Sequence, residues 1–150
     1  RSIRRRLQRM VAPGRVTPEK VAALTPEQCR AAGLSPQKSR YLLDLSRKVL
    51  AGQVRLKRLA RLTDEEVIHE LTQVIGIGVW TAQMFLIFSL GRRDVFPHDD
   101  LGIRSALRNL YRLKSLPDKA ASQRIAQPWR PFATMASWYC WRSLDLDRRT

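Results

Sequence analysis

The hydrophobic side chains of this sequence recur mostly at helical spacing, and the alternation typical of strands is hard to find. Between residues 35 and 52, for example, Leu42, Leu45 and Val49 return at three- and four-residue steps. N-capping residues, prolines and glycines fall between such segments, where helices start and stop. Helices are predicted around residues 1–7, 25–33, 35–52, 63–74, 79–90 and 103–110, with two more that open at Pro117 and Pro131. The pattern therefore predicts an all-α protein of about seven or more short helices.

The segment 79–90 differs from the others because it is apolar nearly all round rather than along one stripe. A helix of this kind is predicted to run through the middle of a protein. Its longest apolar run, Ala82 to Leu90, is too short to span a bilayer, and no secretory signal opens the chain. We therefore expect no membrane partner and an intracellular location, in the cytoplasm or nucleoid of a bacterium or in the nucleus of a eukaryote.

Net charge narrows the choice of partner. The 150 residues include 28 Lys and Arg against 13 Asp and Glu, which gives a net charge of +15. A domain this basic repels itself, which favours a polyanionic partner such as a nucleic acid. The two cysteines, Cys29 and Cys140, are too few for a disulfide scaffold or a four-cysteine iron–sulfur cluster, and we expect both to be buried thiols. Two histidines leave little for a histidine-built metal centre.

The sharpest local motif is the stretch Leu71–Ala82, in which one helix ends, Gly76 and Gly78 turn the chain, and a second helix starts at once. Glycines let the backbone approach a ligand closely, and the amides at a helix N-terminus can meet a phosphate oxygen. The alternative is a plain helical hairpin whose glycines merely permit tight packing. The net charge favours the first interpretation, a hairpin that binds the nucleic-acid backbone. Its phosphate-binding residues would be Gly76, Ile77, Gly78 and Thr81.

Two segments carry a resemblance to a known family. Leu71–Ala82 resembles the helix-hairpin-helix motif of the base-excision DNA glycosylases, and the loop Asp94–Gly102 resembles the segment that follows the motif in that superfamily. The similarity is greatest to the alkylbase group, the 3-methyladenine DNA glycosylases II. Three further stretches agree with that group: Ala31–Ser35 with Lys38, Pro128–Pro131, and Ala136–Ser143.

The resemblance implies the helix-hairpin-helix glycosylase fold, with residues 1–150 as a single domain in two lobes. The lobe with the hairpin is expected over about 17–93, and helices of about 94–150 together with 1–16 are expected to form the second lobe. Members of the family usually carry a further segment upstream of the region matching Arg1, with a glutamine and the residue that wedges into the gap left by the flipped base. That segment is not in this sequence, so the chain is expected to lack the native N-terminal segment.

The resemblance also selects one of two adjacent acids. In the family the catalytic aspartate directly precedes a Leu-Gly pair, which here makes it Asp100. Cleavage of an N-glycosidic bond builds positive charge on the sugar, and a fixed carboxylate stabilises that charge or activates the attacking water. The alternative is that Asp99 or Asp100 merely caps the helix that follows. We expect Asp99 to be the cap and Asp100 to be the catalytic group.

The presence of tryptophan rather than lysine at position 80 predicts that water is the nucleophile. In glycosylases that also nick the strand, the matching position resembles a lysine whose amine attacks the sugar, and tryptophan cannot form a Schiff base. The sequence has no lysine between Lys57 and Lys114. The expected reaction is therefore hydrolysis after base flipping, without lyase activity, on alkylated purines of the 3-methyladenine and 7-methylguanine type. The alternatives are a non-catalytic helix-hairpin-helix DNA-binding module and a glycosylase for another damaged base.

Aromatic side chains are expected to receive the damaged base, because a cationic alkylated purine is attracted to an aromatic face. By motif position Trp80 and Trp141 resemble the pocket aromatics of the family, whereas Trp129 and Trp138 are expected to be core. Phe96 and Tyr139 are expected in the core or at the pocket rim. His98, beside the aspartates, is expected either to contact DNA or to have no role.

The remaining implications concern ligands and partners. By resemblance alone, backbone carbonyls of Thr72, Val74 and Ile77 are expected to hold a structural Na⁺ or K⁺ at the hairpin. No other cofactor and no iron–sulfur cluster are expected. The expected partner is double-stranded DNA that contains damaged bases, bound by a monomer.

Overall fold

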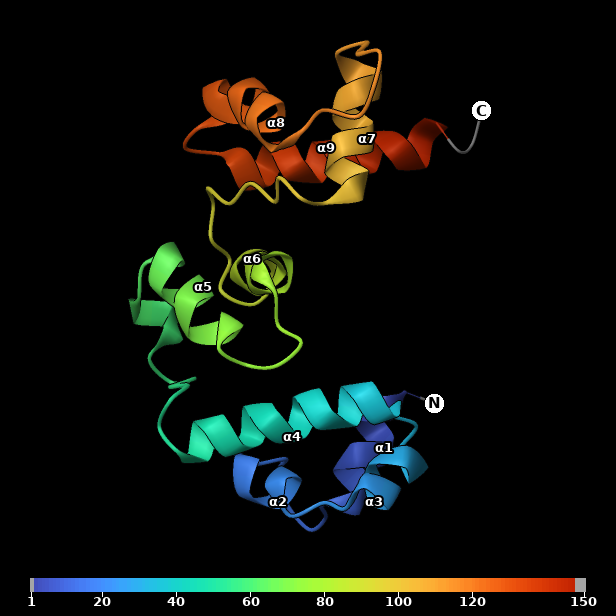
Figure 1. Cartoon of the computed structure of the whole chain (residues 1–150), viewed down its shortest axis with the longest axis vertical. Helices are drawn as coiled ribbons and strands as arrows, with labels where there is room; N and C mark the ends of the chain where they lie inside the picture. The colour runs from blue at the N-terminus through green and yellow to red at the C-terminus, as the bar shows by residue number, and fades with distance from the viewer. Residues whose placement is uncertain (1, 148–150) are drawn as a thin grey trace. The chain divides into compact units, whose positions relative to one another are not determined.

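The computed structural model describes residues 2–147, and every regular element within that range is helical (Figure 1). The helices are, in chain order, α1 (Ile3–Met10), α2 (Pro18–Ala22), α3 (Pro26–Ala31), α4 (Pro36–Leu50), the 3₁₀ turn η1 (Leu59–Arg61), α5 (Asp64–Thr72), α6 (Val79–Phe88), α7 (Leu101–Leu110), α8 (Lys119–Ala126), the 3₁₀ turn η2 (Gln127–Trp129) and α9 (Ala133–Asp147). The prediction of an all-α fold is confirmed for the described residues.

Side-chain caps fix most of the helix starts. At α5 the Thr63 hydroxyl accepts the Glu66 N–H at 3.2 Å, and the Glu66 carboxylate accepts the Thr63 N–H at 2.7 Å. This reciprocal capping box satisfies amide groups that would otherwise lack a partner at the helix end. A second capping box starts α3, and proline follows the cap directly in α2, α3 and α4. Pro117 and Pro131 act differently, because each lies two residues before its helix, α8 or α9.

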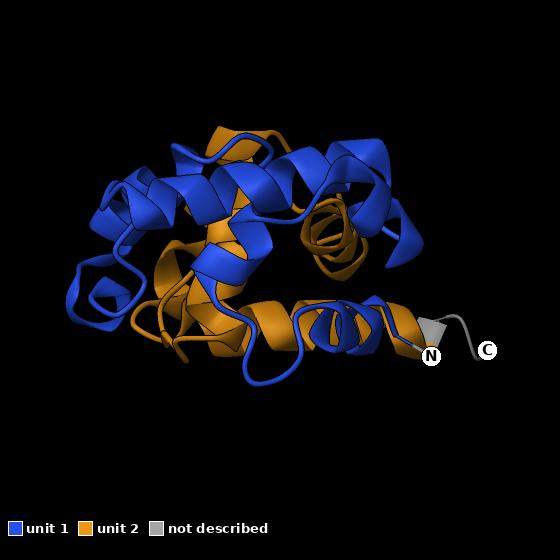
Figure 2. Cartoon of the chain, turned by 90° about the horizontal axis from the view of Figure 1, so that it is seen from below, with its two compact units in different colours: residues 1–78 blue, residues 79–150 orange. Residues whose placement is uncertain are grey.

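The chain divides into two compact units, residues 1–78 and residues 79–150 (Figure 2). In the first unit α4 packs against α2 and α3, and a small core forms around Val11, Leu24 and Cys29. This division differs from the expected lobes in two ways. The boundary follows Gly78 rather than Arg93, and residues 2–16 pack within the first unit, where the Arg6 guanidinium donates to the Ala32 carbonyl at 2.7 Å.

In the second unit α7 packs against α9 over a core of aliphatic and aromatic side chains. Its members are Phe96, Ile103, Ala106, Leu107, Ala126, Ala133 and Cys140. Trp129 packs edge-on against Phe96, with ring centroids 5.6 Å apart, so both of these aromatics belong to the core. This core holds the N-terminus of α7 and the middle of α9 in fixed positions, which matters for the site below.

Helix α6 is not buried all round as its composition predicted. Leu86 and Ala82 are fully buried, but Val79, Trp80 and Phe88 near the helix ends keep 42%, 46% and 55% of their surface exposed. The two exposed aromatic rings are engaged in the contacts described below rather than in a core. None of the helices in the described range combines the length and the apolar character needed to cross a membrane.

Candidate active site

The loop that leads into α7 is buried although it lacks regular structure. Val95, Phe96 and His98 are each less than 9% exposed. Gln83 of α6 donates to the Phe96 carbonyl at 3.3 Å, and the Asp100 N–H donates to the Pro97 carbonyl at 3.0 Å. A buried loop with paired backbone groups is rigid. The residue at its end, Asp100, therefore has a fixed position.

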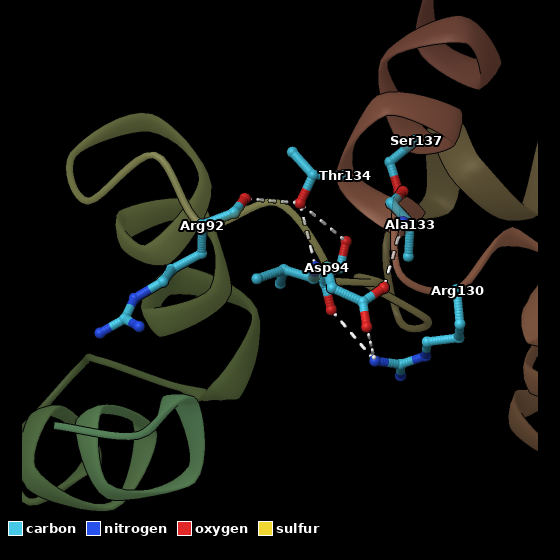
Figure 3. A network of polar contacts seen from close by, with 7 residues as sticks. Arg92, Asp94, Arg130, Ala133, Thr134 and Ser137 are labelled. Atoms are coloured by element: carbon cyan, nitrogen blue, oxygen red, sulfur yellow. Dashed lines mark hydrogen bonds and ion pairs between the residues drawn. The ribbon is translucent and has the colours of Figure 1, made fainter.

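A polar network anchors the start of this loop to the N-terminus of α9 (Figure 3). Asp94 receives the Arg130 guanidinium at 2.8 Å on one carboxylate oxygen and the Ala133 N–H at 3.2 Å on the other. The Thr134 hydroxyl donates to the Arg92 carbonyl at 2.8 Å and accepts the Val95 N–H at 3.0 Å. Asp94 thus caps α9 from a distant part of the sequence, and the same contacts hold the loop.

Asp100 is itself the N-cap of α7, which corrects the expectation that Asp99 caps the helix. Its Oδ1 accepts the Ile103 N–H at 2.8 Å, and its backbone is extended, as an N-cap requires. Asp99 is exposed, and its carboxylate lies 3.1 Å from the Nε2 atom of the buried His98. The cap bond fixes the orientation of the Asp100 carboxylate. Capping by Asp100 is therefore compatible with a catalytic role for the same side chain.

Two indole N–H groups converge on the same carboxylate. Trp80, from α6, donates to Asp100 Oδ2 at 2.8 Å, and Trp141, from α9, donates to Asp100 Oδ1 at 2.9 Å. Together with the cap bond, three N–H donors therefore reach this one side chain. N–H donors to a carboxylate make strong hydrogen bonds that fix its orientation. The structure brings together the three residues that the sequence singled out for catalysis and the base pocket.

Gly102 leaves the space in which Trp141 reaches the carboxylate. A Cβ atom placed on Gly102 would lie 3.0 Å from Asp100 Oδ1 and 3.2 Å from Trp141 Cδ1. Both distances are shorter than ordinary van der Waals contact, so a side chain here would push the indole and the carboxylate apart. The glycine of the Leu-Gly pair therefore serves the contact between Asp100 and Trp141.

An aromatic cluster continues from Trp141. Phe88 lies nearly parallel to Trp141 at 6.0 Å between centroids and meets Trp138 edge-on at 5.4 Å. Trp138 is 51% exposed, so the expectation that it is a core residue was wrong. Tyr139, at 71% exposed, is not a core residue either. Three-residue spacing on α9 suggested one buried stripe, but the helix turns the Trp138 ring toward the surface beside Phe88.

The hairpin has the backbone geometry expected of the two-glycine turn. Gly76 has a positive φ of +84°, a conformation that side chains disfavour, and α6 begins directly after Gly78. Gly76, Gly78 and Thr81 are exposed, and Ile77 is half-buried. The first N–H groups of an α-helix have no partner within the helix, so the start of α6 supplies donors.

The carbonyl groups named for a monovalent cation lie at the end of α5 and in the turn that follows it. The Val74 carbonyl accepts the Ile77 N–H at 3.0 Å and keeps a second lone pair, and Thr72 is the last residue of α5. Carbonyl oxygens are hard ligands of the kind that Na⁺ and K⁺ take in proteins. The donor set therefore fits such an ion.

Both cysteines are core residues. Cys29 and Cys140 are both free and buried, as expected, in the cores of the first and second unit respectively. Burial raises the pKa of the Cys140 thiol to about 11, so it stays protonated at neutral pH and is a poor nucleophile.

Sequence reasoning missed the network around Asp94, although Arg130 lies in a stretch that agreed with the family. The available signals were Asp94 at the start of the loop and the Arg130-Pro131 pair before α9. Nothing in the sequence shows that Asp94 and Arg130 are in contact. Packing of α9 against the loop makes that contact.

The all-helical fold, the two-glycine hairpin and the anchored loop that ends in the capping aspartate agree with the resemblance to the helix-hairpin-helix DNA glycosylases. A sequence model of the HhH-GPD superfamily of base excision DNA repair proteins matches residues 2–131. The chain belongs to this superfamily.

Several relatives of this chain are named DNA-3-methyladenine glycosylases. DNA-3-methyladenine glycosylase 1 of Schizosaccharomyces pombe is 42% identical over 131 residues, which make up 87% of this chain and 58% of that protein. The solved structure of the S. pombe 3-methyladenine DNA glycosylase in complex with abasic DNA matches with a TM-score of 0.81 at 38% identity, covering 94% of this chain and 69% of that one. A DNA-3-methyladenine glycosidase from Bacillus halodurans matches with a TM-score of 0.81 at 31% identity, covering 95% and 65%.

These matches confirm the resemblance to the alkylbase group. The chain nevertheless spans only 58% of the length of the S. pombe relative, so that relative has a substantial part with no counterpart here.

Proposed function

We propose that this chain carries the catalytic centre of a DNA glycosylase that releases alkylated purines from duplex DNA by hydrolysis of the N-glycosidic bond. The observation that carries the proposal is the Asp100 carboxylate, fixed at the N-terminus of α7 by one backbone and two indole N–H donors. The similarity of the chain to 3-methyladenine DNA glycosylases supports alkylated purines as the substrate class and damaged duplex DNA as the partner.

Asp100 acts in this proposal on the charge that develops at the sugar. As the bond to the base breaks, positive charge accumulates on the sugar ring, and a preorganised carboxylate stabilises that charge more than mobile water does. An alkylated purine is already cationic and leaves readily. The site therefore needs a fixed anion more than it needs a proton donor.

Water is the proposed nucleophile. A carboxylate offers about four acceptor positions. The three N–H donors around Asp100 leave one for an attacking water. Trp80 uses its N–H to hold the carboxylate and has no amine with which to attack the sugar. The product is therefore an abasic site in an intact strand, with no lyase step.

The proposed base pocket uses aromatic faces. Trp80 and Trp141 point their N–H groups at Asp100, so both indoles would lie beside a sugar bound at this carboxylate. A cationic purine over an indole face gains a cation–π attraction of about 0.5–2 kcal/mol that a normal base does not. This difference favours damaged bases over undamaged ones.

The hairpin is proposed to bind the DNA backbone rather than its sequence. Amide groups of Gly76, Gly78 and Thr81 would donate to phosphate oxygens, helped by the positive end of the α6 dipole. The Ile77 N–H already donates to the Val74 carbonyl, so Ile77 would contribute through its place in the turn rather than as a free donor. Carbonyls of Thr72, Val74 and Ile77 would hold a Na⁺ or K⁺ ion, which would supply positive charge next to a phosphate. We propose that the enzyme binds DNA as a monomer.

The proposal is tested by incubating the chain with methylated duplex DNA and analysing released bases by chromatography, while the DNA strand is examined on a denaturing gel. The expected result is release of 3-methyladenine and 7-methylguanine, with strand breaks only after alkali treatment. DNA binding without base release would contradict the glycosylase proposal and favour a non-catalytic DNA-binding module. Strand breaks without alkali would contradict the absence of a lyase step.

A further inference from the structure

Helix α4 contacts the turn of the hairpin through a carboxylate. Asp44 Oδ2 accepts the Ile75 N–H at 2.8 Å, across 31 residues of sequence. The Asp44 side chain is only 19% exposed, and it also pairs with Lys48 at 3.0 Å. The bond from the Ile75 N–H, assisted by Lys48, holds the pKa of Asp44 below its ordinary value. The carboxylate is therefore charged, and its bond to Ile75 intact, throughout the neutral range.

A second side chain of α4 lies against the next residue of the turn. A Cβ atom placed on Gly76 would collide with the aromatic ring of Tyr41. Tyr41 lies one helical turn before Asp44, so both side chains project from the same face of α4. The Tyr41 hydroxyl in turn accepts a hydrogen bond from Gln37. Two consecutive residues of the turn, Ile75 and Gly76, are thus each contacted by α4.

Burial does not hold this turn in place by itself. Val74 is 2% exposed and anchored, but Ile75 is 49% exposed and Gly76 has no side chain to bury. The backbone at Ile75 and Gly76 therefore depends on partners that reach it from outside the turn. Asp44 and Tyr41 are those partners within the first unit.

We propose that Asp44 and Tyr41 brace the hairpin turn and act as positioning residues for DNA binding. The inference rests on the proposed function only in taking duplex DNA as the ligand of the hairpin. A turn that is already ordered binds DNA without first losing conformational entropy, so the brace raises affinity. The charge of Asp44 would by itself repel phosphates, and its pairing with Lys48 offsets this effect.

The test compares Asp44→Ala, Asp44→Asn and Glu65→Ala in binding to a duplex with one abasic site, measured by fluorescence anisotropy. Asp44→Ala is expected to raise Kd about tenfold, which is the effect of losing one hydrogen bond to a charged acceptor. Asp44→Asn keeps an oxygen that can accept the Ile75 N–H and is expected to stay within about threefold of wild type. Glu65, exposed on α5, controls for charge, because losing a negative charge alone tightens DNA binding.

Two further readouts separate positioning from catalysis and from folding. Single-turnover base release at saturating enzyme is expected to change less than about twofold in Asp44→Ala, because the brace acts on binding. In wild type, the amide signal of Ile75 in an NMR titration is expected to shift with a midpoint below the ordinary pKa of aspartate, and this shift should vanish in Asp44→Asn.

An unchanged Kd in Asp44→Ala would overturn the inference. If that variant fails to fold, an Ile75 amide that does not follow the titration of Asp44 would overturn it instead. Binding to an abasic duplex involves no base release. A wild-type protein that binds this duplex but releases no base would therefore contradict the proposed function without contradicting the inference about Asp44 and Tyr41.

Discussion

At the scale of single residues, the three N–H donors around Asp100 have two structural roles. The bond from Ile103 sets where the carboxylate lies at the start of α7, whereas the two indole bonds set how the aromatic rings lie around it. Trp80 is 46% exposed, so in the proposed reaction it is the indole that is more accessible to an entering nucleotide. Trp141 is half-buried and is held by Phe88 and by the space above Gly102. Of the two indoles that contact Asp100, Trp80 is therefore the more exposed and Trp141 the more constrained.

Replacing an indole by a benzene ring separates the N–H group from the aromatic face. Trp141→Phe removes the donor to Oδ1 and keeps an apolar ring, so base release is expected to slow by roughly tenfold, the effect of about 1.4 kcal/mol of lost orientation. Trp80→Phe is expected to slow release by a similar factor. Single-turnover assays on methylated duplex measure both. Rates equal to wild type in both variants would show that the indole N–H groups do not orient Asp100.

The sequence singles out Asp100 as a candidate, but it does not show which side chains surround it. The Leu-Gly pair marks the aspartate by resemblance, and tryptophans in the right motifs suggested a pocket. Which of two adjacent aspartates caps α7 depends on backbone geometry, and both side chains have the same capping propensity. The convergence of Trp80 and Trp141 depends on how α6 and α9 pack, and a single sequence does not show packing.

At the scale of elements, the loop that carries Asp100 owes its rigidity to its contact with α9. Asp94 provides both an ion pair to Arg130 and a cap for the Ala133 N–H. Arg130 is 55% exposed, and an exposed ion pair contributes at most about 1 kcal/mol. The cap contributes more, because helix N-caps stabilise by about 0.5–2 kcal/mol. The network therefore stabilises the fold mainly by capping the N-terminus of α9 with a residue of the loop.

Two substitutions distinguish the cap from the ion pair. Asp94→Ala removes both contacts and is expected to lower the free energy of unfolding by about 1–3 kcal/mol. Arg130→Met removes only the ion pair and is expected to cost less than about 1 kcal/mol. Urea unfolding followed by circular dichroism measures the two values. An equal loss in both variants would mean that the ion pair, and not the cap, holds the loop.

Local sequence accounts for most of the helices and for the starts of α3, α4, α5 and α6. Capping boxes at Thr25 and Thr63 marked α3 and α5 because their hydrogen bonds involve residues close in sequence. Helix α2, with only five residues, has too little hydrophobic periodicity to be detected, although Thr17 caps it. Helix α9 starts at Ala133, whose N–H is capped by Asp94 from a distant part of the sequence, and Pro131 lies two residues before that start.

At the scale of the whole molecule, charge is the dominant property. The 28 basic residues exceed the 13 acidic ones in a chain of 150, and this excess favours the proposed binding of DNA through many weak phosphate contacts. Composition alone indicated this partner class. The division into two units after Gly78 was not predictable, because both sides of the hairpin read as one continuous motif in the sequence.

Salt should weaken DNA binding strongly, since each neutralised phosphate releases counterions. We expect Kd for an undamaged duplex to rise roughly 100-fold or more between about 50 and 200 mM salt. Fluorescence anisotropy over a salt series measures the slope. A Kd that changes less than about threefold would indicate that few phosphates are neutralised, which contradicts the role assigned to the net charge.

Base release by Asp100→Asn, beside wild type and Asp99→Asn, tests the central claim most directly. Asparagine keeps the size and one acceptor oxygen but removes the negative charge that stabilises the sugar, so release is expected to fall by roughly 100-fold or more. Asp99→Asn removes the neighbouring charge without touching α7 and is expected to retain most activity. Both variants should still bind abasic duplex. If Asp100→Asn released bases at the wild-type rate, or if Asp99→Asn alone abolished release, the assignment of Asp100 as the catalytic carboxylate would be wrong.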